Sequence, residues 1–150
     1  MIHWCIRRYR PRFAGGTDPR KRQTMGPFDT ALSALRAAAL TPDRESLVFA
    51  EGKVVVLPSS PYRTAALSWL DRAVTTAETG DKVSARDYAG AALREFEEVR
   101  AIAMGYKAAY SRYQAARAAY ETDPTDEGYD AICAALLEVD RLRKALVDAT

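Results

Sequence analysis

Residues that could carry acid–base or metal chemistry are few in this sequence. The only histidine is His3, and the two cysteines, Cys5 and Cys133, lie far apart and outside any Cys-x-x-Cys pattern. Carboxylates cluster at 95–98 and at 123–130, but carboxylate metal sites in helical bundles use a Glu-x-x-His pattern, which this chain does not contain. We therefore predict that the protein is not an enzyme and has no catalytic residue, metal site or cofactor.

Four tyrosines form the most distinctive pattern in the chain. Tyr106, Tyr110, Tyr113 and Tyr120 follow one another at helical spacings within a long stretch that contains no proline. Tyrosine joins an apolar ring to a polar hydroxyl and is enriched at protein interfaces. Two interpretations follow: the rings are covered by another helix of the same chain, or by a protein partner or second copy. The latter predicts a protein-interaction or assembly module, such as a structural component of a larger complex or a phage particle.

The N-terminal segment is basic and contains several aromatic residues. Residues 1–24 carry seven basic side chains and one acidic one, a formal charge of +6, whereas the whole chain has +2. Such a segment can neutralise phosphates and stack on bases, so a nucleic-acid-associated protein is the alternative function. Two plainer interpretations stay open, a solvated basic tail and a natural start at Met25. The basic residues concerned are Arg7, Arg8, Arg10, Arg12, Arg20, Lys21 and Arg22.

Helices must position these side chains, because apolar residues recur at intervals of three and four along most of the chain. We predict a mainly α fold, an antiparallel helical bundle built on one long central helix over 85–121. Ser84 and Asp87 form a capping-box-like pair at its start. Pro124 can open a last helix over 124–148, which should pair with the second half of the long helix as an antiparallel coiled hairpin.

Three shorter segments precede the long helix. A helix is predicted over 29–40 and another over 61–79, each with an apolar face and a proline near its boundary. Residues 46–57 consist of two β-branched or aromatic runs joined by Glu51-Gly52. This pattern predicts a small β-hairpin that lies on the bundle.

Length and composition set the remaining expectations. A chain of 150 residues with 48% hydrophobic and 28% charged residues is typical of one globular domain. We predict a flexible basic arm over 1–27 and a single helical domain over 28–150. No apolar run reaches membrane-spanning length, and two cysteines cannot form a disulfide framework. A cytoplasmic protein with a protein partner or self-association, and without membrane contact, is expected.

Overall fold

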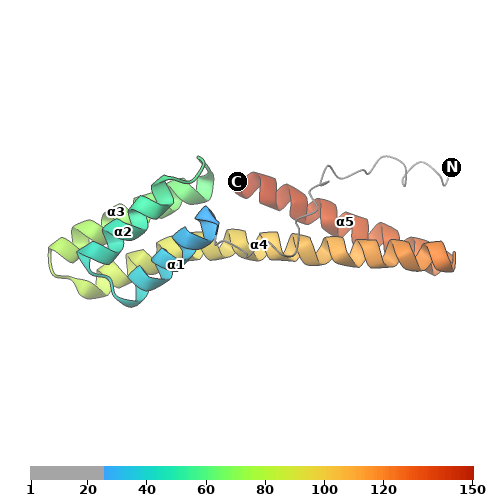
Figure 1. Cartoon of the computed structure of the whole chain (residues 1–150), viewed down its shortest axis with the longest axis horizontal. Coiled ribbons are helices and arrows are strands. Elements are labelled where there is room, and N and C mark those ends of the chain that lie inside the picture. The colour runs from blue at the N-terminus through green and yellow to red at the C-terminus, as the bar shows by residue number, and fades with distance from the viewer. Residues whose placement is uncertain (1–25) are drawn as a thin grey trace.

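A computed structural model describes residues 26–150, and within that range the chain forms five α-helices and no strand (Figure 1). The mainly helical class predicted from the sequence is therefore confirmed. The predicted arm over 1–27 lies almost entirely outside the described residues. The helices are α1 (Pro27–Leu40), α2 (Arg44–Val55), α3 (Pro61–Glu78), α4 (Lys82–Thr122) and α5 (Asp126–Ala149).

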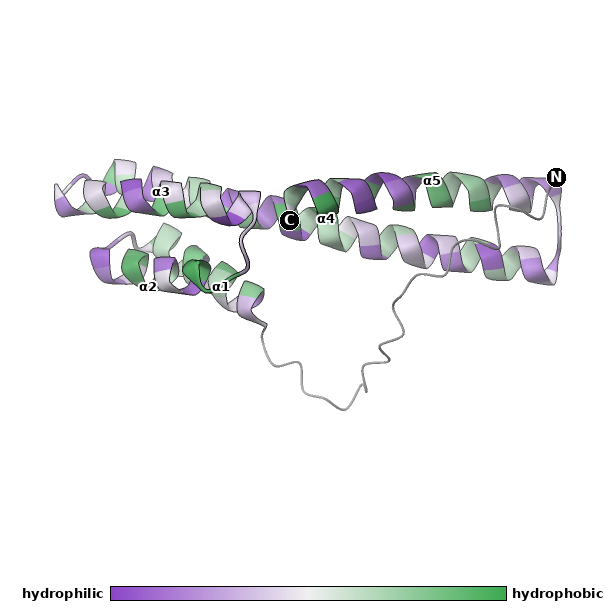
Figure 2. Ribbon diagram, turned by 90° about the horizontal axis from the view of Figure 1, so that it is seen from above, coloured by the Kyte–Doolittle hydropathy of each residue, from purple (hydrophilic) through white to green (hydrophobic). Residues whose placement is uncertain are grey.

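The long helix α4 takes part in both halves of the molecule. Its first half packs against α1 and α3, and α2, which packs on α1 and α3, completes a four-helix head; its second half runs beside α5 as a two-helix hairpin (Figures 1 and 2). The hairpin extends away from the head, so α5 packs chiefly on α4. The molecule is thus elongated, with two separate apolar cores along one continuous helix.

The predicted β-hairpin over 46–57 is wrong, because this segment forms most of α2. Asp43 caps the helix, and its carboxylate accepts a hydrogen bond from the Ser46 backbone N–H at 2.7 Å. The buried positions of α2 have helical spacing: Leu47, Ala50 and Val54. The opposite side of α2 is apolar as well, which hides the helical period in the sequence, and packing against α1 and α3 overrides the strand preference of the β-branched residues.

The start of the long helix also differs from the prediction. Asp81, rather than Ser84, is the N-cap, and it accepts hydrogen bonds from the Ser84 backbone N–H at 3.0 Å and from the Ser84 hydroxyl at 2.6 Å. Gly80 adopts a positive φ of 86° just before this cap, a conformation that glycine adopts without steric cost. The α3–α4 connection is therefore a tight turn, and α4 begins three residues earlier than expected.

Aromatic rings and alanines build the core of the head. Phe96 of α4 is fully buried, stacks on Phe28 of α1 with ring centroids 5.1 Å apart, and meets Tyr62 of α3 edge to face at 5.0 Å. Fully buried alanines in the same core allow the helix axes to approach closely. They are Ala31, Ala38, Ala50, Ala66, Ala73, Ala89 and Ala92.

Two capping carboxylates should make the stability of the fold depend on pH. The hydrogen bond from the Ser46 backbone N–H lowers the pKa of Asp43, and the hydrogen bonds from the side chain and backbone of Ser84 lower the pKa of Asp81. A lowered pKa in the folded state contributes stability that is present above the unfolded pKa and is lost as the pH falls through the folded one. We therefore expect the urea concentration at the midpoint of unfolding to decrease as the pH is lowered below about 4.

The control for this prediction is the double variant Asp43→Asn with Asp81→Asn. Asparagine keeps one oxygen, which can accept the capping hydrogen bond from the backbone N–H, but it does not titrate. The variant should therefore show a flatter decline of the urea midpoint between pH 5 and pH 2. A decline as steep as that of the wild type would contradict a role of these two carboxylates.

Candidate interaction surfaces

The tyrosines lie on the side of α4 that faces α5. Tyr113 is buried, with 6% of its surface exposed, and Tyr106, Tyr110 and Tyr120 are half-buried around the same cluster. The ring centroids of Tyr106 and Tyr110 are 6.4 Å apart, and those of Tyr110 and Tyr113 are 6.1 Å apart. Tyr113 is thus covered within the chain, whereas the other three tyrosines retain exposed surface at the edge of the hairpin. An interaction role for these tyrosines stays a prediction.

The hairpin has a small core for its length. Its cluster contains four buried residues, Ala109, Tyr113, Ile132 and Val139, whereas the core cluster of the head contains fifteen. A Cβ atom added at Gly105 would lie 3.8 Å from Leu142, and one added at Gly128 would lie 3.3 Å from the ring of Tyr120. These distances show which residues of the two helices lie opposite one another, and they place the middle of the hairpin near Ser111 on α4 and Leu137 on α5.

The outer side of α2 carries most of the exposed large apolar side chains among the described residues of the head. Phe49 is 58% exposed and Val56 is 71% exposed, while Val48 and Val55 are each nearly half exposed. At about 100° per residue these side chains lie on one side of the helix together with Gly52. We call this surface the α2 face; it consists of Val48, Phe49, Gly52, Val55 and Val56.

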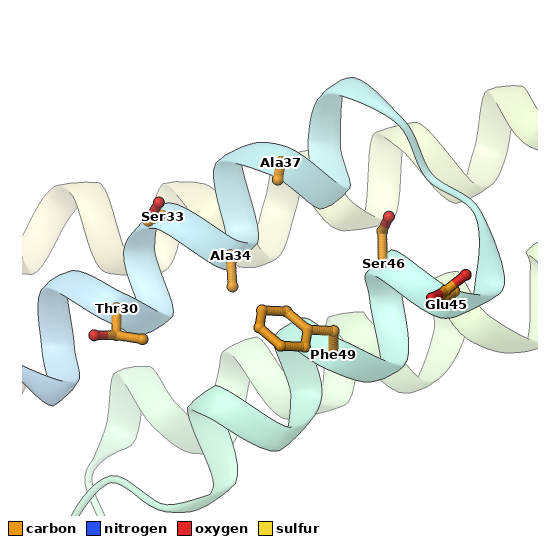
Figure 3. Close-up of a pocket in the computed structure, with 7 residues that line it drawn as sticks. All are labelled: Thr30, Ser33, Ala34, Ala37, Glu45, Ser46 and Phe49. Carbon is orange, nitrogen blue, oxygen red and sulfur yellow. The ribbon is translucent and has the colours of Figure 1, made fainter.

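An open groove continues the α2 face toward α1 (Figure 3). Its volume is about 450 Å³, and the Phe49 ring forms one wall and points toward Ala34 on the other side. The polar groups in the lining are the Thr30, Ser33 and Ser46 hydroxyls and the Glu45 carboxylate; Ala37 completes the lining. A groove of this composition is suited to receive an apolar side chain.

Three acidic residues lie on the two helices that form the groove and the α2 face. Glu45 lines the groove, Asp29 lies one turn before Ser33 on α1, and Glu51 lies beside Val48 on α2. Among the residues that the structure describes, none of these three acids is in an ion pair. The basic residues of α1 and α2 are already engaged: Lys53 lies over the Phe49 ring at 5.0 Å, Arg36 pairs with Glu97 at 3.6 Å, and Arg44 pairs with Glu78 at 3.0 Å.

Sequence reasoning missed the α2 face because it assigned this segment to strands. The signal was present, since residues 47–57 are apolar at positions that lie on both sides of a helix. A helix that is apolar all round is normally buried all round. The sequence alone did not show which side the head would cover.

Three further sequence predictions concern metal binding, membrane contact and nucleic-acid binding. No group of three or more histidine, cysteine, aspartate or glutamate side chains in residues 26–150 is arranged to hold a metal ion. None of the described helices combines the length and apolar character needed to cross a membrane. The predicted nucleic-acid-binding residues, Arg7 to Arg22, lie outside the described part of the chain.

Comparisons with protein-family models, with curated proteins and with solved structures found no match to this chain.

Proposed function

We propose that this chain is a non-enzymatic protein-interaction module and a component of a larger assembly. The observation that carries the proposal is the α2 face, an apolar helix side that the head leaves uncovered. Burying one large apolar side chain contributes roughly 1.5–3 kcal/mol, and contiguous exposed apolar surface commonly marks a binding site. The non-enzymatic part rests on the sequence, whose single histidine is His3 and which contains no nucleophile–base pattern.

The partner that best fits this surface is a protein that presents a basic amphipathic helix. Such a helix would lay its apolar side on the α2 face and insert one side chain into the groove beside Phe49. Basic residues flanking that side would meet Asp29, Glu45 and Glu51, which have no ion pair among the described residues. A Cβ atom at Gly52 would have no neighbour within 4 Å, so a partner can approach the α2 backbone closely there.

The double variant Phe49→Asp with Val56→Asp tests this function. Both side chains are exposed, so the variant should remain folded. It should bind a synthetic amphipathic helix, with leucine on one side and lysine on the other, at least tenfold more weakly than the wild type does. The same helix with glutamate in place of lysine should bind the wild type more weakly, because Asp29, Glu45 and Glu51 have no ion pair among the described residues and would repel it. Fluorescence anisotropy of the labelled peptides measures both effects.

Thr64→Asp with Ser68→Asp serves as the matched control, because it adds the same two charges to exposed positions of α3. Binding of the leucine–lysine helix should be unchanged in this control. Equal binding by the wild type, the α2 variant and the control would overturn the assignment of the α2 face as the binding surface.

A further inference from the structure

The outer side of α5 carries three evenly spaced residues whose charges are opposite at the two ends. Asp130, Leu137 and Lys144 follow one another at intervals of seven, so they form one stripe along the helix. Leu137, at the centre of the stripe and of the hairpin, is 72% exposed. Neither Asp130 nor Lys144 is in an ion pair among the described residues. The stripe therefore has an acid at one end, a base at the other and a leucine between them.

We propose that a second copy of this chain packs its hairpin antiparallel against this one, about a two-fold axis near Leu137. The reversal brings Leu137 to its counterpart and places Asp130 of each copy opposite Lys144 of the other. Two hairpins joined in this way bring their α5 helices together in an isologous interface. This interface lies on a different surface from the α2 face, so the inference does not depend on the function proposed for that face.

The side of the hairpin next to the stripe supplies the apolar contact. At about 100° per residue, Tyr110 of α4 and Cys133 and Leu136 of α5 lie on the same side of the plane that contains the two helix axes. All three side chains are half-buried by the hairpin. A second copy would cover the remaining surface of these residues. It would thereby add buried apolar contacts to a hairpin whose own core contains only four buried residues.

Charge along the hairpin selects the antiparallel arrangement. The half nearer the tip, residues 111–137, has five acidic and two basic residues. The half nearer the head, residues 100–110 with 138–148, has five basic and three acidic residues. Antiparallel packing brings each tip half against the oppositely charged half of the other copy, whereas parallel packing would place like charge on like. The second copy therefore fits this chain in one direction.

Charge exchange at the two ends of the stripe tests the proposal. Asp130→Lys and Lys144→Glu should each weaken dimerisation of the full-length chain at least tenfold, and the double variant should return to within about threefold of the wild type. Fourteen residues separate the two positions, which is about 21 Å along the helix. They do not contact each other within one chain, so rescue in the double variant requires a second chain. Sedimentation equilibrium at several protein concentrations measures the dissociation constants, and circular dichroism verifies that each variant is folded.

Arg86→Glu is the matched control, because it makes the same charge change at an exposed position of α4 in the head. It should leave dimerisation unchanged. A chain that is monomeric at every concentration overturns the proposal, as does a dimer that neither single variant weakens or that the double variant does not restore. Loss of the dimer in the α2 variant Phe49→Asp with Val56→Asp, with no effect of the stripe variants, would also overturn it and would place self-association on the α2 face.

Discussion

Replacing Phe96 with alanine is expected to lower the free energy of unfolding by about 3–5 kcal/mol. Phe96 is fully buried and lies at the centre of a ring cluster with Phe28, at 5.1 Å, and Tyr62, at 5.0 Å. These rings come from three different helices, so the cavity left by the substitution cannot be filled by the movement of one side chain. The destabilisation combines the transfer free energy of the ring with the weaker dispersion attraction among the side chains that surround the cavity.

Urea unfolding followed by circular dichroism measures this effect, and Phe49→Ala is its control. The control removes the same atoms from a side chain that is 58% exposed, so the free energy of unfolding should change by less than about 1 kcal/mol. A Phe96→Ala variant that loses no more stability than the control would show that the ring cluster does not hold the head together.

Replacing Val139 with aspartate is expected to release α5 from α4 while the head stays folded. Val139 is fully buried in the hairpin core. An unpaired carboxylate at this position has no hydrogen-bonding partner in an apolar cluster, and its burial costs several kcal/mol, about as much as such a small core can contribute. Since α5 packs chiefly on α4, its release should leave the packing of the head intact.

Hydrogen–deuterium exchange resolved by peptide measures this separation. Amides of residues 126–149 should exchange rapidly in the variant, while amides of α1, α2 and α3 should remain protected. Val147→Asp provides the control, because it introduces the same charge at an exposed position of the same helix. Rapid exchange in the head of the Val139→Asp variant would instead show that the two cores unfold as one cooperative unit.

The helical part of the fold could be predicted because its signals are local. Apolar residues of the long helix recur at spacings of three and four, interrupted only at Arg117. Pro61 and the Thr122-Asp123-Pro124 turn mark where neighbouring helices begin or end. The helix ends were predicted less well. At the start of α4, Asp81 and Ser84 are both plausible caps by residue type, and the positive φ of Gly80 places Asp81 in that position.

Which apolar side chains form the candidate surfaces depends more strongly on packing between distant segments of the chain. Local sequence favoured strands over 46–57, since β-branched residues follow one another without helical alternation. Contacts of Leu47, Ala50 and Val54 with the rest of the head made this segment a helix and left Phe49 and Val56 outside. No local rule states which of two apolar helix sides a domain will cover, because that depends on the helices packed around it.

The helical class, the positions of most helices and the tyrosine spacing follow from local sequence alone, because each depends on residues within a few turns of one another. Packing between helices, by contrast, made α2 a helix with an uncovered apolar face. It also decided that Tyr113 is covered by α5 while Tyr110 stays at the edge, and that Asp130, Leu137 and Lys144 remain uncovered on α5. The physical reason is that burial is a property of the whole arrangement of helices, whereas helical periodicity is a property of each segment alone.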